Sequence, residues 1–127
     1  LSGLDGGLIY NSWPDMNGNF FPGDVSYLDL FNTQLFSNAS IIQFLHRFTA
    51  YLLLFFIIIL NYYFMKNKRN INNIILFDLA ILFQVFLGII TLISGVEIKY
   101  ASLHQLGSIF VLTTYLVILY KNFNLRL

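Results

Sequence analysis

Cysteine is absent from this chain of 127 residues, and charged residues are scarce. The missing thiol excludes a disulfide framework, a thiolate zinc site, an iron–sulfur cluster and a cysteine nucleophile. Only 10% of the residues are charged and 57% are hydrophobic, whereas an ordinary globular domain has about 25% charged residues. Seven basic and six acidic side chains cannot cover a water-soluble surface, so we predict that most of the surface faces lipid.

Two further absences limit the function. The formal net charge is +1, without a patch rich in Lys and Arg, and we therefore expect no nucleic-acid partner. The chain starts at Leu1 with neither an initiating Met nor the pattern of a signal peptide. Its length suits one domain, and we expect it to be a piece of a longer polypeptide.

Three long apolar segments predict membrane-spanning helices. Residues 48–65 and 100–120 carry no charge, and Asp78 is the only charged residue between 71 and 96. A hydrocarbon core about 30 Å thick needs roughly 20 helical residues, and helices satisfy their own backbone hydrogen bonds in lipid. We predict an all-α, polytopic membrane helical bundle with transmembrane helices over 40–64, 72–95 and 100–121.

The basic residues predict how the bundle is oriented. None precedes Arg47, and five others lie in the first connection or after the third span. The positive-inside rule then places that connection and the C-terminus in the cytoplasm, or in the matrix of a mitochondrion. The five cations are Lys66, Lys68, Arg69, Lys121 and Arg126.

Residues 1–39, on the outer side, are expected to form a compact loop at the membrane interface. They contain five of the eight glycines and both prolines, interleaved with aromatic rings that prefer the interface. The loop is either an interfacial anchor or a lid over a site in the bundle. The rings belong to Trp13, Phe20, Phe21, Tyr27, Phe31 and Phe36.

The two histidines carry most of the expected chemistry. His46 lies about six residues into the first span and His104 about four residues into the third, which puts both roughly 6–9 Å below the outer boundary. The first and third spans run in the same direction, so the two imidazoles can face each other at one depth. Small residues lie on both histidine faces of the helices: Thr49, Ala50, Ala101, Gly107 and Ser108.

The space between these faces suits a haem held by two axial imidazoles. Two other interpretations stay open, because small residues also permit close helix packing and a membrane histidine can simply bond to a neighbour. Zinc is disfavoured, since no third ligand lies at that depth. Arg47 either extends to the interface or pairs with a haem propionate. Asp78 lies towards the inner side, where we expect a structural or near-interface role.

Four segments resemble motifs of haem A synthase of the proteobacterial and mitochondrial type. Residues 4–16, LDGGLIYNSWPDM, are similar to its GLDAGxxYNxWPxM loop, and residues 36–47 to its FxNPxxxQFxHR segment. Residues 84–92 resemble its QxxLGIxTL helix and residues 103–105 its second histidine motif. The matches run in the family's order over nearly the whole chain. One departure is Ala39, where the family usually has Pro.

The resemblance implies that the chain is the C-terminal half of such an enzyme. It would contain three of the four transmembrane helices of that half. This half resembles the one that holds haem b, with His46 and His104 as axial iron ligands and Arg47 near a propionate. Gln43 stands where the N-terminal half has the Glu of an ExxHR motif, so no catalytic residue is expected here.

The implied activity of the whole protein is oxidation of the C8 methyl of haem O to the formyl group of haem A, for cytochrome c oxidase. The implied partners are the N-terminal half, the haem O substrate, the lipid bilayer, and haem O synthase or an electron donor. The implied location is a bacterial or mitochondrial inner membrane. Two alternatives remain: a free-standing bis-His b-type electron-transfer cytochrome subunit, and a structural membrane protein whose histidines only pack.

The first testable prediction concerns orientation. Cysteines placed at Ser26 and at Asn67 in intact cells should label from outside and from inside respectively, because the cations are concentrated on one side. Preferential labelling of position 67 from outside would overturn the orientation.

Overall fold

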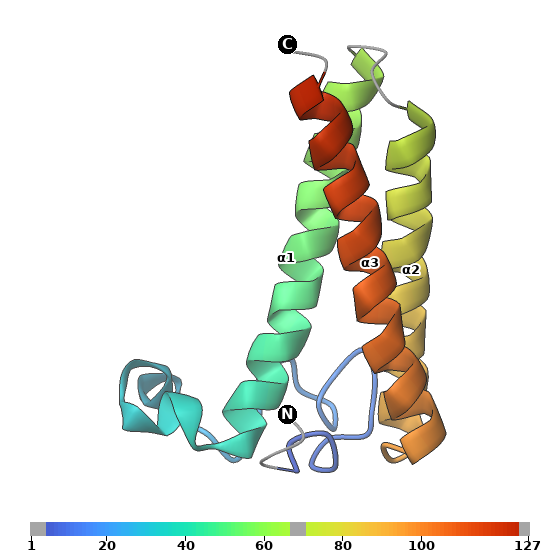
Figure 1. Ribbon diagram of the computed structural model, residues 1–127. Coiled ribbons are helices and arrows are strands. Elements are labelled where there is room, and N and C mark those ends of the chain that lie inside the picture. Colours follow the sequence, from blue (N-terminus) through green and yellow to red (C-terminus); the bar gives the residue numbers. More distant parts are fainter. Residues whose placement is uncertain (1–4, 67–70, 125–127) are drawn as a thin grey trace.

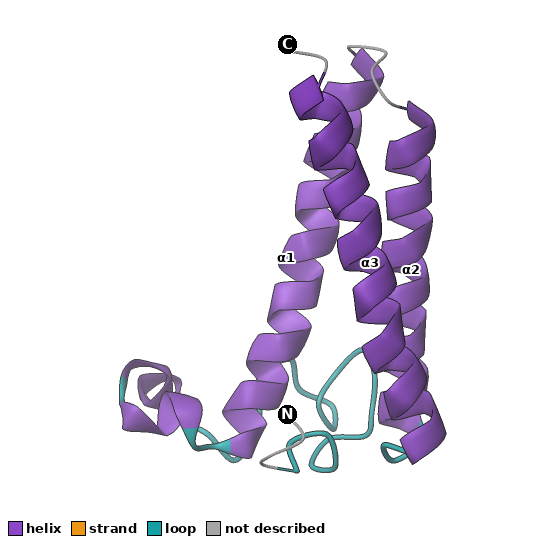
Figure 2. Ribbon diagram, viewed as in Figure 1, coloured by secondary structure: helices purple, strands orange, loops and turns teal. Residues whose placement is uncertain are grey.

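The computed structural model describes residues 5–66 and 71–124. Three α-helices follow a loop that contains two short 3-10 helices, η2 (Tyr27–Phe31) and η3 (Thr33–Phe36). The α-helices are α1 (Ala39–Lys66), α2 (Ile71–Ile93) and α3 (Ile98–Asn124), and Figure 2 shows no strand in the described parts.

The all-helical membrane fold is confirmed. Each of the three helices is long and apolar enough to cross a membrane, and each overlaps one of the predicted spans, with ends that differ by one to three residues. Three of the five orienting cations, Lys68, Arg69 and Arg126, lie outside the described residues.

Local signals explain where the helices begin and end. The Asn38 side-chain oxygen caps α1, accepting from the amides of Ser40 at 2.9 Å and Ile41 at 3.2 Å. At the end of α2 the chain turns at Gly95, whose φ of 69° is left-handed. The amide of Gly95 bonds to the carbonyl of Leu92 and that of Val96 to Thr91, the double closure typical of a glycine-ended helix. After this turn the chain reverses direction and forms α3.

The helices pack unevenly. α2 lies along α3, while α1 stands further away at the end of the bundle where the N-terminal loop lies (Figure 1). In the most apolar window of α2, 28% of the residues are buried, against 6% in α1 and 11% in α3. Thus α2 is the central helix, and α1 and α3 leave wide apolar faces exposed.

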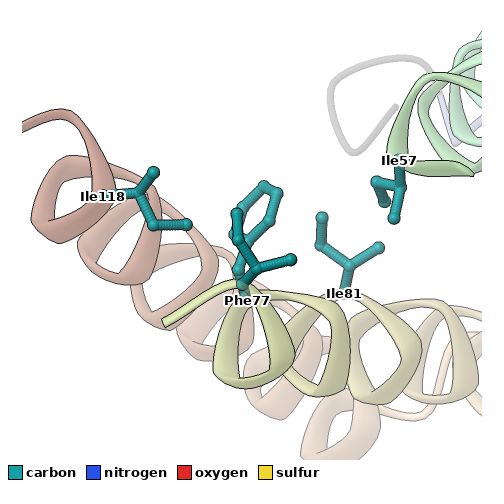
Figure 3. Packing of buried hydrophobic residues seen from close by; sticks show 5 residues of the cluster. Ile57, Phe77, Ile81 and Ile118 are labelled. Carbon is teal, nitrogen blue, oxygen red and sulfur yellow. The ribbon is translucent and has the colours of Figure 1, made fainter. Parts of the chain in front are cut away.

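A hydrophobic cluster joins all three helices, and the residues in Figure 3 belong to it. Ile81 of α2 is 1% exposed and packs in this cluster with Ile57 of α1 and Ile118 of α3. Because all three helices contribute, the cluster sets the distance between α1 and the α2–α3 pair at this level. The buried members are Ile57, Ile74, Phe77, Ile81 and Ile118.

Candidate functional site

The two histidines come from different helices and lie beside each other. The imidazole rings of His46 on α1 and His104 on α3 have centroids 6.3 Å apart, and their planes make an angle of 81°. His46 is exposed and His104 is half-buried. The expectation that parallel spans bring both rings to one depth therefore agrees with the structure.

A backbone carbonyl of α2 holds the His104 ring. Nδ1 of His104 lies 3.1 Å from the carbonyl oxygen of Gln84, and a carbonyl can only accept, so Nδ1 carries the proton and donates. In return, the Gln84 side-chain Nε2 donates to the His104 carbonyl at 2.9 Å. A neutral ring protonated at Nδ1 presents an unprotonated Nε2, the form of imidazole that binds metals.

Two glycines allow this close contact between α2 and α3. A Cβ on Gly88 would lie 2.9 Å from Cε1 of His104, and a Cβ on Gly107 would collide with the side-chain oxygen of Gln84. Any side chain at position 88 would therefore displace the His104 ring. Of the small residues noted beside the histidines in the sequence, Gly107 packs against Gln84, whereas Gly88, which was not among them, contacts the His104 ring.

Arg47 binds the N-terminal loop. Its Nη1 donates to the carbonyls of Ser12 at 3.0 Å and Asp15 at 2.8 Å, and its Nη2 donates to the carbonyl of Tyr10 at 2.8 Å. Three of the five guanidinium N–H groups are thus used. Nε is buried without a hydrogen-bond partner among the described residues, so one edge of the group remains available to an acceptor.

Gln43 also binds the loop. Its Nε2 donates to the Tyr10 carbonyl at 2.9 Å, and the side chain is only 2% exposed. A carboxylate at this position could not donate to that carbonyl, so the amide suits the contact that the loop requires. Neither Gln43 nor Arg47 was predicted from the sequence to bind the loop, because such partners are backbone carbonyls and leave no residue pattern.

A second set of hydrogen bonds holds Tyr10 from the other side. The Tyr10 hydroxyl and the Ser40 hydroxyl both donate to the carboxylate of Asp24, the latter at 2.7 Å. Burial, reinforced by this bond, raises the pKa of Tyr10, and the bond from Tyr10 lowers the pKa of Asp24. Asp24 therefore stays ionised at neutral pH. Its contribution to the free energy of unfolding is lost only as the pH falls through that lowered pKa.

The loop also reaches the opposite helices. The Asn11 side chain donates to the Leu92 carbonyl at the end of α2, at 3.0 Å. Gly7 lies so close to the turn before α3 that a Cβ there would be 2.8 Å from the Val96 side chain. Residues 5–16 therefore form a strap, bound to α1 on one side and to the α2–α3 turn on the other, across the end of the bundle where α1 begins (Figure 1).

Asp78 lies apart from this site. It precedes Gly88 by ten residues on α2, about 15 Å along the helix axis, towards the end of the bundle that lies away from the strap. It is half-buried, and one carboxylate oxygen has no hydrogen-bond partner in the described part of the chain. Within the ranges 5–66 and 71–124, no group of three or more His, Cys, Asp or Glu residues could hold a metal ion.

The strap yields a prediction for Arg47. Arg47→Met removes three charge-assisted bonds to the loop, each worth about 1.5–3 kcal/mol, so residues 10–15 should become protease-sensitive in haem-free protein. Lys121→Met, which removes a cation at the far end of α3 that bonds to Asn73, is the matched control. Equal protection of the loop in both variants would show that Arg47 does not hold it.

Comparison with known proteins identifies the family of the chain. A family model described as cytochrome oxidase assembly protein matches residues 1–116. The haem A synthase of Pelagibacter ubique is 75% identical over 124 residues, which cover 98% of this chain and 37% of that protein. No solved structure matches the chain.

More distant relatives give the same result. The haem A synthase of Bartonella quintana is 39% identical over 108 residues, 83% of this chain and 30% of that protein. That of Rickettsia felis is 38% identical over 115 residues, 89% of this chain and 34% of that protein. The chain thus spans about a third of the length of the curated relatives it matches. It belongs to the haem A synthase family of cytochrome oxidase assembly proteins.

Proposed function

We propose that this chain is the haem b-binding part of a haem A synthase, with His46 and His104 as the two axial ligands of one iron. The whole protein would oxidise the C8 methyl of haem O to the formyl group of haem A for cytochrome c oxidase. It would work in a bacterial or mitochondrial inner membrane, with the C-terminus on the cytoplasmic or matrix side. The observation that carries the proposal is the placement of the two imidazoles.

The distance between the rings fits a shared metal ion. Bonds between a metal and an imidazole nitrogen are about 2 Å long, so two rings on opposite sides of one ion have centroids about 6 Å apart; the observed separation is 6.3 Å. The 81° angle between the planes is compatible, because each ring can turn about its own metal–nitrogen bond. The Nδ1–H of His104 donates to a carbonyl, the usual outer partner of a ligating histidine.

The same residues favour electron transfer over catalysis in this half. A haem with two imidazole ligands has no open coordination position for an oxidant. Gln43 offers no titratable proton, and its amide is occupied by the Tyr10 carbonyl. Asp78 lies too far towards the inner side to act at the histidines. When bound, haem b would supply one-electron chemistry, while the chain orients the ligands and the strap covers the outer end.

Arg47 is proposed to contact a propionate through the donors that the loop leaves unused. Its Nε is buried and has no hydrogen-bond partner among the residues that the structure describes, and a guanidinium pairs well with a carboxylate. A propionate there would share Arg47 with the carbonyls of Tyr10, Ser12 and Asp15, so loop and haem would stabilise each other. The remaining partners proposed for the whole protein are its N-terminal half, haem O, and haem O synthase or an electron donor.

Substitution of the histidines tests the ligation. In the full-length protein, His46→Ala and His104→Ala should each abolish one six-coordinate low-spin haem signal, since each removes one of two axial ligands. Gln105→Ala, next to His104 and exposed, is the control and should keep the signal. A histidine variant with an unchanged spectrum would exclude that residue as a ligand, and a wild-type protein without a Soret band would exclude haem altogether.

The assignment of electron transfer predicts that this chain alone makes no haem A. Residues 1–127 should be expressed with a source of haem O, and haem A should be assayed by chromatography beside the full-length protein and a vector-only control. Haem A above the vector-only level would place the active site in this half.

A further inference from the structure

We propose that α2 is the positioning element for the His104 ligand: Gly88 admits the imidazole, and the Gln84 carbonyl fixes its tautomer and strengthens it as a donor to iron. This inference rests on the proposed haem ligation and adds two positioning residues to it. Neither Gly88 nor Gln84 would touch the iron, and both would act through His104.

The first step is the hydrogen bond at Nδ1. The carbonyl oxygen of Gln84 lies 3.1 Å from His104 Nδ1, and an Nδ1–H bonded to a carbonyl leaves Nε2 as the only nitrogen able to bind a metal. Such a bond also makes the ring a more basic ligand. A more basic ligand stabilises ferric over ferrous iron, so this contact should lower the midpoint potential of the haem.

The second step is that this contact requires a residue without a side chain at position 88. A Cβ on Gly88 would lie 2.9 Å from Cε1 and 3.5 Å from both nitrogens of the ring. Contact at 2.9 Å is below van der Waals distance, so the ring must move away from α2. The Gln84 carbonyl lies on the same helix one turn before Gly88, and movement away from α2 therefore lengthens the Nδ1 bond as well.

The third step is that two hydrogen bonds between Gln84 and His104 join α2 and α3 at this level. Gln84 Nε2 donates to the His104 carbonyl at 2.9 Å, so the ring and the backbone of His104 are both tied to the same residue. Gly107 gives the Gln84 amide the space that this bond needs. In contrast, the described residues provide His46 with no hydrogen bond at either ring nitrogen, and the strap is bonded to its helix through Gln43 and Arg47.

The test compares redox and spectroscopic properties of the His104-dependent haem in the full-length protein. That haem is defined as the low-spin signal lost in His104→Ala. Gly88→Ala is expected to shift its EPR g-values and to raise its midpoint potential. The weaker Nδ1 bond should change the preference for ferric iron by about tenfold, which for a one-electron couple is about 59 mV.

Leu82→Val is the matched control. It shortens a side chain on the same helix that is 59% exposed, six residues before Gly88, and should leave both g-values and potential unchanged. A Gly88→Ala protein that binds haem with wild-type g-values and potential would overturn the inference. So would a control that shifts as much as Gly88→Ala, because the effect would then reflect general loosening of α2.

If the Gly88→Ala protein does not accumulate in cells, the Gln84→Leu variant provides the test of the inference. Leucine removes the bond from Nε2 to the His104 carbonyl, which holds this part of α3 against α2. Without it, the bond from His104 Nδ1 to the backbone carbonyl of residue 84 should lengthen. The same signal should therefore shift in the same direction by a smaller amount. An unchanged potential would overturn the inference. A wild-type protein with no His104-dependent haem signal would instead contradict the proposed function, so the two failures are distinguishable.

Discussion

The separation between α1 and the α2–α3 pair, at the end of the bundle that the strap crosses, is the constraint on which the site depends. α1 is the least buried helix, and the hydrophobic cluster around Ile81 joins it to the pair at one level of the bundle. Where α1 begins, the strap joins α1 to the α2–α3 pair instead. Residues 5–16 bind α1 through Gln43 and Arg47 and the end of α2 through Asn11, so they set the distance across which the imidazoles face each other.

The two histidines are held in different ways, and this follows from the packing. α2 and α3 are in close contact because Gly88 and Gly107 carry no side chain, and the His104 ring is bonded directly to α2. His46 lies on the helix that stands apart, where its neighbour Arg47 is the link to the strap. His104 is therefore bonded directly to a neighbouring helix, whereas His46 lies on a helix that the strap holds through Gln43 and Arg47.

The segment before α1 consists of two parts in different environments. Residues 10–16 are held by hydrogen bonds, and Tyr10 and Met16 are buried. The 3-10 helices η2 and η3 instead project beside the start of α1 (Figure 1), and their apolar side chains are exposed: Phe31 is 88% and Phe36 80% exposed. Rings of this kind suit the membrane interface. Residues 5–16 therefore bridge the helices, while residues 27–36 present apolar surface.

The sequence by itself determined the fold class, the three helices and the two histidines as candidate ligands. Hydropathy over about 20 residues reports the lipid solvent directly, and helical rise converts position along the chain into depth. It also carried the family motifs, which the relatives confirm. Only the tertiary structure decided that Arg47 and Gln43 hold the strap, that Tyr10 and Asp24 pair, and that Gly88 accommodates His104. These contacts join residues far apart in the chain, often through backbone atoms that every residue has, so no local pattern of side chains could encode them.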